Sequence, residues 1–230
     1  MKGSSERNSA STRDRILDAA ELLFAERGYA AVSMREIAAM ASVRLSLLTY
    51  HLGSKDALYH AVFARRAGEL AQARCAALDS ALADASPKIR DLIAAFVGPS
   101  VKQRFAQGVR GAAFALLTAR EAVDPREAER GLLAEHFDPT AGRFIDAFAR
   151  VHPLATPESR VDAYLFCVGT LIVSMVSGER FKRLTGGTTA RASASPSDVD
   201  ALIKRLVDYC TGGVEKIMTD TMVTERKLKP

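Results

Sequence analysis

Apolar residues recur along most of the chain at the three- and four-residue spacing of an amphipathic helix. The first such segment, residues 12–27, places Ile16, Ala20, Leu23 and Phe24 on one face. Strand signals are nearly missing, because no stretch alternates cleanly at period two and the sequence has no Asn-Gly or Asp-Gly turn. The pattern therefore predicts an all-α protein.

Five of the eight prolines follow a residue with good N-cap chemistry, which predicts five helix starts. A proline in the first turn loses no helical hydrogen bond, and the side-chain oxygen before it caps the free amides. The junctions are Ser86-Pro87, Asp124-Pro125, Asp138-Pro139, Thr156-Pro157 and Ser195-Pro196.

These signals divide the chain into short N-terminal helices and a longer helical region. Helices are expected over 12–27, 34–41, 43–51, from Ser54 to about Leu82, in five or six segments within 87–183, and over 198–218. Breaks are expected near Gly98-Pro99, Asp124-Pro125, Asp138-Pro139 and Pro153. A loop rich in Gly, Ser, Thr and Ala is expected over 185–197, and an unstructured polar arm over 1–10.

The N-terminal segment carries the boundary signals of three helices. Gly28 is placed as the left-handed C-cap of the first helix, and Ser33 with Glu36 forms a capping box at the start of the second. The third helix has Leu48 and Leu52 at inward positions. Two short helices joined by a tight turn and packed on a longer one make the helix-turn-helix motif, whose second helix enters a DNA major groove.

Between its inward positions the third helix exposes side chains suited to base edges, thymine methyl groups and phosphates. They are Arg44, Leu45, Ser46, Leu47, Thr49 and Tyr50. The alternative is a small three-helix packing element with no role in DNA binding, and this set of exposed side chains argues against it.

The stretch from Thr12 to Tyr59 resembles the N-terminal domain of the TetR family of bacterial repressors, in order and without gaps. The matching segments are residues 16–20, Phe24, Gly28-Tyr29, residues 33–38 and residues 50–58. The resemblance implies an all-α homodimer that binds a palindromic operator and releases it when a small ligand enters the C-terminal domain. The domains expected are a disordered arm (1–10), the helix-turn-helix domain (11–56), a ligand-binding and dimerisation domain (57–222) and a basic tail (223–230).

The resemblance also assigns DNA contacts to single residues. Ser33 and Arg35 match positions that touch phosphate and base at the start of the second helix. The positions that clamp the DNA backbone correspond to Tyr50, His51 and Lys55, and those that read bases to Leu45, Ser46, Leu47 and Thr49. Arg35 as a solvated charge and His51 as a packing histidine are the alternatives.

Four positions depart from the family pattern. Members usually have Gly, then Ser or Thr, then Gly, then Tyr where this chain has Ser42, Arg44, Ser46 and Thr49. Ser42 must take a turn conformation that Gly adopts more easily. Two exposed leucines in the reading helix fit either thymine methyl contacts or atypical operator binding, so relatives do not predict the operator sequence.

Eight of the ten phenylalanines lie after residue 90, spread over successive expected helices. Converging rings suit the largely apolar pocket of a small-molecule site, and an ordinary aromatic core is the alternative. The expected ligand-binding residues are Phe96, Arg110, Phe114, Thr118, Phe144, Phe148 and Phe166. Residues 120–125 and 137–144 resemble C-terminal domains of regulators that sense fatty or acyl compounds.

The helix that begins near Val161 is apolar almost all round, and the last helix repeats apolar residues at strict helical spacing. TetR-like proteins build a four-helix dimer interface from two helices at this place in the chain, and an intramolecular core is the alternative. The expected interface residues are Tyr164, Val168, Ile172, Met175, Leu202, Leu206 and Cys210.

Composition changes this picture little. A net charge of +5 permits a nucleic-acid partner without requiring one. The three cysteines lie far apart and are expected to be reduced thiols, and the four histidines have no zinc-site spacing. We therefore expect no metal, no cofactor and no enzymatic activity.

The expected cellular location follows from the absence of signal-peptide and membrane-span patterns in the sequence. The opening residues do not form a signal peptide, and the longest uncharged run, residues 163–178, is too short for a membrane span and is expected to be a buried helix. A cytoplasmic regulator with DNA, a small apolar ligand and a second copy of itself as partners is the expectation. The alternative is a DNA-binding dimer controlled by a protein partner or by nothing, whose C-terminal domain only dimerises.

Overall fold

The structure is a computed structural model and describes residues 2–187 and 195–227. These residues form helices and connecting turns only, which confirms the all-α prediction. The helices are α1 (Lys2–Arg27), α2 (Met34–Met40), α3 (Leu45–Leu52), α4 (Lys55–Leu82), α5 (Ile89–Ala106), α6 (Gly108–Ala122), α7 (Glu127–Arg130), α8 (Leu132–His136), α9 (Asp138–Val151), α10 (Pro157–Val176), α11 (Gly178–Leu184) and α12 (Pro196–Lys227).

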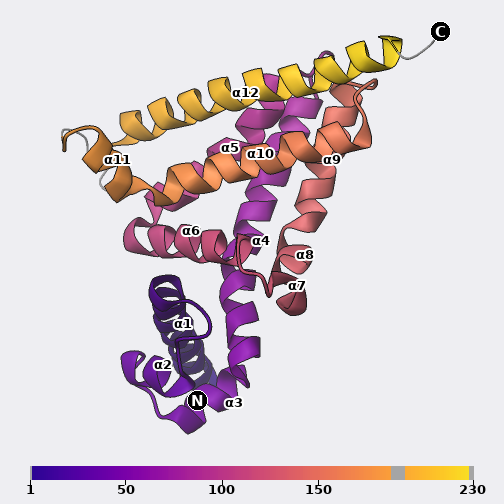
Figure 1. Cartoon of the computed structure of the whole chain (residues 1–230). Helices are drawn as coiled ribbons and strands as arrows, with labels where there is room; N and C mark the ends of the chain where they lie inside the picture. Colours follow the sequence, from indigo (N-terminus) through magenta and orange to yellow (C-terminus); the bar gives the residue numbers. More distant parts are fainter. Residues whose placement is uncertain (1, 188–194, 228–230) are drawn as a thin grey trace.

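The long helix α4 is the axis of the molecule (Figure 1). The helices α1, α2 and α3 gather at its N-terminal end, and α10 and α12 lie side by side across its other end. Between these two groups runs α6, which packs against α1 on one side and against α5 and α10 on the other. The helices α1, α2 and α3, called the DNA module after their predicted role, are therefore joined to the rest of the chain by two helices, α4 and α6.

Capping confirms two of the five predicted helix starts in full. Thr156 accepts a hydrogen bond from the Ser159 amide at 3.2 Å, and Pro157 is the first residue of α10. Ser195 accepts one from the Asp198 amide at 3.3 Å at the start of α12.

The other three junctions lie near helix starts but do not cap them as predicted. After Ser86-Pro87 the helix α5 begins at Ile89, and after Asp124-Pro125 the helix α7 begins at Glu127. Asp138 is itself the first residue of α9, so its side chain does not cap the helix. Proline restricts the residues around it without fixing which of them starts the helix.

Three boundary predictions were wrong. The helix α5 continues through Pro99, because its buried residues pack α4, α9 and α12 on several sides and outweigh the lost hydrogen bond. The expected arm at 1–10 belongs to α1 from Lys2, and no proline interrupts that stretch. The last helix runs on to Lys227, into the expected tail. Residues 188–194 of the expected loop lie outside the described residues.

Two apolar clusters form the core. One joins α1, α2, α3 and α4 to α6, and Phe63 of α4 meets Phe114 of α6 edge to face, with ring centroids 6.0 Å apart. The other is built by α5, α9, α10 and α12 around Phe96 and Phe144. Because α6 contributes Phe114 and Leu117 to the first cluster, the boundary between the modules is a continuous apolar contact.

Charged side chains reinforce the same boundary. Arg65 of α4 pairs with Asp18 at 2.9 Å and with Glu21 at 2.5 Å, both on α1. The buried Glu121 of α6 accepts a hydrogen bond from the Tyr59 hydroxyl of α4 at 2.9 Å and pairs with Arg130 at 2.8 Å. Paired buried charges hold the helices in one arrangement, because separating them would leave unpaired ions.

Candidate DNA-binding surface and ligand cavity

The helix α3 is anchored by two leucines and presents its other side to solvent. Leu48 is completely buried and Leu52 is 8% exposed, as their inward positions predicted. The side chains expected to contact DNA are exposed along α3 and at its N-cap, and Tyr50 is 83% exposed. They are Arg44, Leu45, Ser46, Leu47, Thr49 and Tyr50. The Thr49 hydroxyl donates to the Leu45 carbonyl at 3.0 Å, which leaves its methyl group outward.

Ser42 makes the turn between α2 and α3. Its φ of 53° places it in the left-handed region, as the departure from the family's glycine predicted. Among the described residues it is the one non-glycine residue with a positive φ. The carbonyl oxygen of Ser42 accepts a hydrogen bond from Arg15 of α1 at 3.4 Å, so the strained turn is tied to the longer helix.

The start of α2 is fixed by the predicted capping box. The Glu36 amide donates to the Ser33 hydroxyl at 3.3 Å, and the Ser33 amide donates to the Glu36 carboxylate at 2.8 Å. Hydrogen bonds from the Ser33 hydroxyl and from Arg27 lower the pKa of Glu36 to about 2. The Ser33 side chain is thus engaged within the protein, whereas Arg35 is exposed beside α3.

Two further predicted contacts lie where α3 meets α4. Lys55, the first residue of α4, places its ammonium 4.3 Å from the ring centroid of Tyr29, and burial lowers the pKa of this lysine. His51 is half-buried, and its ring lies edge to face with Tyr50 at 5.4 Å. The Tyr29 hydroxyl donates to Asp56, which fixes the ring under Lys55.

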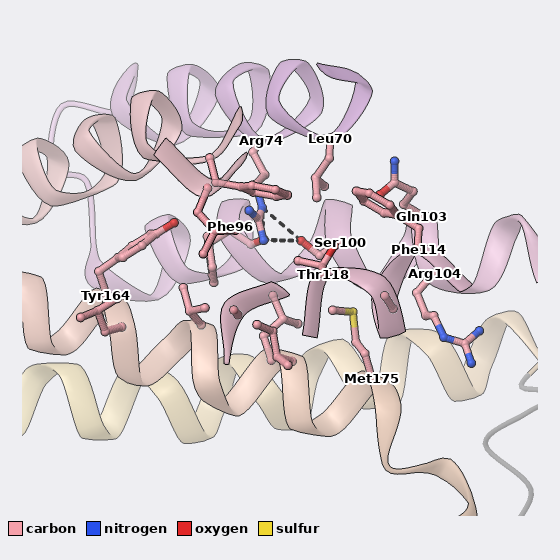
Figure 2. A pocket seen from close by; sticks show the side chains of 18 of the residues that line it. Leu70, Arg74, Phe96, Ser100, Gln103, Arg104, Phe114, Thr118, Tyr164 and Met175 are labelled. Carbon is pink, nitrogen blue, oxygen red and sulfur yellow. Dashed lines mark hydrogen bonds between the residues drawn. The ribbon is translucent and has the colours of Figure 1, made fainter. Parts of the chain in front are cut away.

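A cavity of about 140 Å³ lies between α4, α5, α6 and α10. Figure 2 shows side chains of α4, α5 and α6 facing those of α10 across it. Phe96, Phe114 and Thr118 of the predicted ligand site line this cavity. Four residues expected in the dimer interface also line it, namely Tyr164, Val168, Ile172 and Met175.

The other predicted ligand residues lie elsewhere. Phe144 and Phe148 of α9 are completely or almost completely buried in the core, and Phe166 is 60% exposed on the outer side of α10. Arg110 pairs with Asp18 of α1 at 2.7 Å, outside the cavity. Aromatic spacing predicted convergence, but the rotation of each helix about its axis decides which rings reach the cavity.

Sequence reasoning missed several polar residues that line the cavity, above all Arg74, Ser100 and Arg104. Arg74 lies on α4 between the buried Leu70 and Leu78, four residues from each. An arginine at an inward position of an apolar stripe was a readable signal, because arginine is almost never buried without a function or a partner.

The apolar residues of α10 and α12 divide into an inner and an outer set. Leu202, Leu206 and Cys210, expected at the dimer interface, are buried inside the chain, where α12 packs on α5 and α10. The outer set is exposed and comprises Phe166, Val173 and Val176 of α10 and Tyr209 of α12. An outer groove lined by Phe166 and Tyr209 separates the two helices.

The helix α10 is the one helix in the described part of the chain that is long and apolar enough to cross a membrane. The packing of α10 explains its apolar composition, since one side lines the cavity and packs on the core while the other side is open. The expectation that this helix is buried was therefore only half right.

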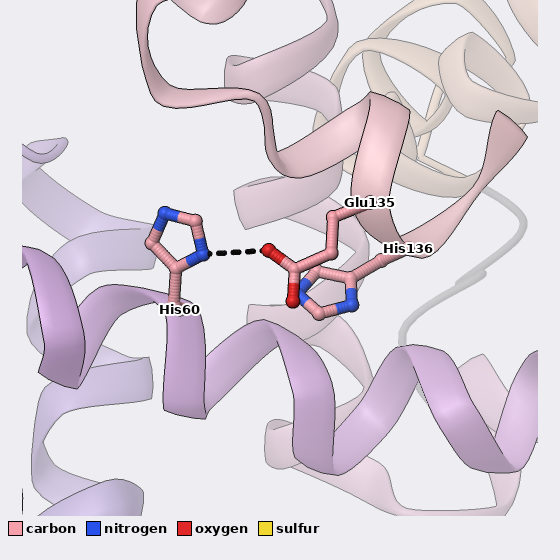
Figure 3. A group of neighbouring side chains, drawn as sticks. All are labelled: His60, Glu135 and His136. Carbon is pink, nitrogen blue, oxygen red and sulfur yellow. Dashed lines mark hydrogen bonds and ion pairs between the residues drawn. The ribbon is translucent and has the colours of Figure 1, made fainter.

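Three potential metal ligands meet where α4 approaches α8 (Figure 3). His60 and Glu135 pair at 3.0 Å, and the Nε2 atom of His136 lies 3.7 Å from the other carboxylate oxygen. Their ligand atoms all lie within 4.8 Å of one another, which the spacing of the histidines in the sequence did not reveal. The hydrogen bond between His60 and Glu135 ties α4 to α8.

Two segments of this chain match known protein families. Residues 16–62 match the family described as bacterial regulatory proteins, tetR family. Residues 94–213, more than half of the chain, match the family described as tetracyclin repressor-like, C-terminal domain.

A stretch of 47 residues is 55% identical to the HTH-type transcriptional repressor Rv3405c of Mycobacterium tuberculosis strain H37Rv. The same identity is found with the HTH-type transcriptional regulator Mb3439c of Mycobacterium bovis. The match covers 20% of this chain and only 25% of the length of each of these relatives.

Solved structures match over most of the chain. The hemolysin II transcriptional regulator HlyIIR has a TM-score of 0.58 at 17% identity and is covered over 98% of its length, with 88% of this chain aligned. The fatty acid degradation regulator FadR from Bacillus halodurans has a TM-score of 0.60 at 17% identity, with 88% of this chain and 95% of that chain covered. These likenesses show a shared fold. Together with the two family matches, they establish that this chain is a helix-turn-helix transcriptional regulator of the TetR family.

Proposed function

We propose that this protein is a cytoplasmic repressor that binds a palindromic operator as a homodimer and releases it when a small molecule fills the cavity. One observation carries the proposal: α6 lines the cavity with Phe114 and Thr118 and packs against α1 of the DNA module. A ligand that moves α6 therefore acts directly on the helix that supports the DNA-reading helix.

The DNA-reading part of the proposal rests on α3 and its surroundings. The exposed leucines at 38% and 39% and the exposed Tyr50 suit apolar contacts with thymine methyl groups and contacts with the DNA backbone. Arg44 at the N-cap of α3 and Arg35 in the first turn of α2 are exposed cations. Phosphate contacts of this kind position the protein, and base contacts select the sequence.

The dimer part of the proposal rests on the outer set of α10 and α12. Phe166 and Val173 are each 60% exposed and Tyr209 is 72% exposed. Exposure of so many apolar side chains to water is unfavourable, and a second copy packed on them would remove them from water. Gly169 lies between Phe166 and Val173 on α10, and Gly212 and Gly213 follow Tyr209 on α12; none of the three has a neighbouring atom within 4 Å of an added Cβ. Two copies of α10 and α12 would then form a four-helix interface with closed two-fold symmetry.

Ligand release follows from the geometry of a dimer on DNA. Two recognition helices reach successive major grooves only when their centres lie about 34–36 Å apart. The cavity is lined by α4 through Leu70 and Arg74 as well as by α6, so both helices that carry the DNA module contact the ligand. A ligand that fits better when these helices are displaced shifts the dimer away from the DNA-binding state.

Selection from random double-stranded DNA tests the proposal. It should recover a palindrome, and Arg35→Ala should weaken binding to that palindrome by about 1–3 kcal/mol while leaving random DNA unaffected. Tyr50→Ala should weaken binding to both alike, with an unchanged melting temperature because Tyr50 is 83% exposed. Arg90→Ala is the matched control, because Arg90 is an exposed arginine of α5 that pairs with Asp208 of α12. Recovery of no sequence preference would contradict operator binding.

A further inference from the structure

Arg74 is a buried cation without an anionic partner. It is 6% exposed, and among the described residues no carboxylate oxygen lies within ion-pair distance of its guanidinium. Arg66, which is buried to a similar degree at 8%, pairs with the Glu21 carboxylate at 3.2 Å. The contrast matters because a buried charge is costly unless an opposite charge compensates it.

The hydrogen bonds of Arg74 go to neutral oxygens. Its Nε atom donates to the Phe96 carbonyl at 3.2 Å and to the Ser100 hydroxyl at 3.1 Å, and Nη2 donates to the same hydroxyl at 2.7 Å. Its Nη1 atom has no hydrogen-bond partner among the described residues. Burial lowers the pKa of Arg74 to about 10, which still leaves the guanidinium charged at neutral pH.

Two further residues that line the cavity have a donor atom without a hydrogen-bond partner among the described residues. Thr118 Oγ1 and Arg104 Nε are buried without a hydrogen-bond partner, and both residues line the cavity. Tyr164 lines it too, close enough for Arg74 to oppose the rise that burial causes in the pKa of this phenol. Of the residues that the structure describes, Asp138 is the one carboxylate that lines the cavity, and it is an exposed residue in the first turn of α9.

The geometry points to an amphipathic anion. We propose that the effector is a small carboxylate with an apolar ring or short chain, and that its carboxylate pairs with Arg74. This inference rests on the proposed function, in which the cavity holds the effector. A guanidinium presents paired donors that match the two oxygens of a carboxylate. The ligand's apolar part would lie against Phe114, Leu171 and Met175.

Cavity size sets the scale of that apolar part. The volume of about 140 Å³ is close to the ~150 Å³ cavity that holds one benzene molecule. A single aromatic ring or a chain of several methylene groups therefore matches the volume of the cavity.

A structural role for Arg74 is the competing explanation. Pro99 leaves one carbonyl of α5 without its helical amide, and Arg74 donates to the carbonyl of Phe96 in the same turn region. A purely structural role uses the donors and the position of the guanidinium over the Phe96 ring, 4.1 Å from the ring centroid, and needs no anion. A ligand role needs the charge itself.

Calorimetric titration of the full-length protein without DNA separates the two roles. The probes are butanoate, hexanoate, octanoate, benzoate and phenylacetate, each paired with its uncharged amide of nearly equal shape. We expect at least one acid to bind about 10- to 100-fold tighter than its amide. Arg74→Gln should remove that preference, and Arg74→Lys should retain part of it.

Arg90→Gln is the matched control, because Arg90 of α5 is exposed and pairs with Asp208 at 2.5 Å outside the cavity. It should leave the preference for the acids unchanged. Equal binding of acids and amides to the unaltered protein would overturn the inference without any variant. So would a retained preference in Arg74→Gln, or binding of none of the acids.

DNA affinity, measured separately, keeps the two proposals distinct. Acids that bind through Arg74 but leave operator affinity unchanged would contradict ligand release and support the anion site. Release of the operator by an amide as strongly as by its acid would contradict the anion site and support ligand release.

Discussion

Arg120 of α6 donates a hydrogen bond of 2.9 Å to the carbonyl oxygen of Ala25, in the last turn of α1. A second bond of 3.1 Å reaches the carbonyl of Glu26. Carbonyls at the end of a helix have no amide partner within it, so Arg120 serves as a C-terminal cap supplied by another part of the chain. The partners of Arg120 are thus backbone oxygens of α1.

Through this cap α6 connects the ligand cavity to α1. Replacing Arg120 should therefore weaken the coupling between the cavity and the DNA-binding surface. Arg120→Met should lower the free energy of unfolding by about 1–2 kcal/mol, since two hydrogen bonds are lost. It should also reduce the factor by which ligand weakens DNA binding, while ligand affinity without DNA stays the same. Urea unfolding and paired titrations measure both effects. Arg126→Met is the control, and full coupling in Arg120→Met would show that this contact does not transmit the signal.

The outer set of α10 predicts a dimer that a single charge disrupts. Val173→Glu should give a monomer in sedimentation experiments at micromolar concentration, because dimerisation would bury an unpaired carboxylate. Val123→Glu changes an even more exposed valine, at 80%, away from α10 and α12, and should remain a dimer. A dimeric Val173→Glu would place the interface elsewhere on the molecule.

The turn at Ser42 predicts an increase in stability on substitution by glycine. A side chain in the left-handed region costs about 1–2 kcal/mol, and glycine recovers part of this against its larger unfolded-state entropy. Ser42→Gly should therefore raise the free energy of unfolding by about 0.5–1 kcal/mol. Ser42→Val, with a branched side chain at the same φ of 53°, should lower it. Lower stability of the glycine variant would mean that the serine side chain has a stabilising contact that outweighs the strain.

Local chemistry predicted the DNA module well because its signals lie close together in the sequence. The capping box of Ser33 and Glu36 and the inward position of Leu48 depend only on residues within one or two turns. The left-handed turn at Ser42 was also readable, since neighbouring helices leave few conformations for a short connection.

The C-terminal region was less predictable because its helices are apolar on more than one side. On α10 both Val168 and Val173 are valines, yet one lines the cavity and the other is open to solvent. Residue type does not distinguish an inner from an outer side when both are apolar. The packing of α10 on α5, α6 and α12 decides it, and that packing involves residues far apart in sequence.

The capping box also predicts how stability responds to acid. The pKa of Glu36 is lowered from 4.5 to about 2, so the folded protein holds this carboxylate ionised where the unfolded chain protonates it. The stability it contributes is fully present above about pH 4.5 and is lost as the pH falls toward 2. Glu36→Gln should flatten the dependence of unfolding free energy on pH in that window. An unchanged slope would assign the acid sensitivity to other carboxylates.

The central claim is that the cavity and the DNA surface oppose each other within one dimer. The most direct measurement is the affinity of the full-length protein for its selected palindrome, by fluorescence anisotropy, with and without the tightest-binding carboxylate of the series. We predict that the saturating acid weakens DNA binding by about 5- to 150-fold, and that the palindrome weakens binding of the acid by the same factor. A DNA affinity that is identical with and without bound acid would contradict the account.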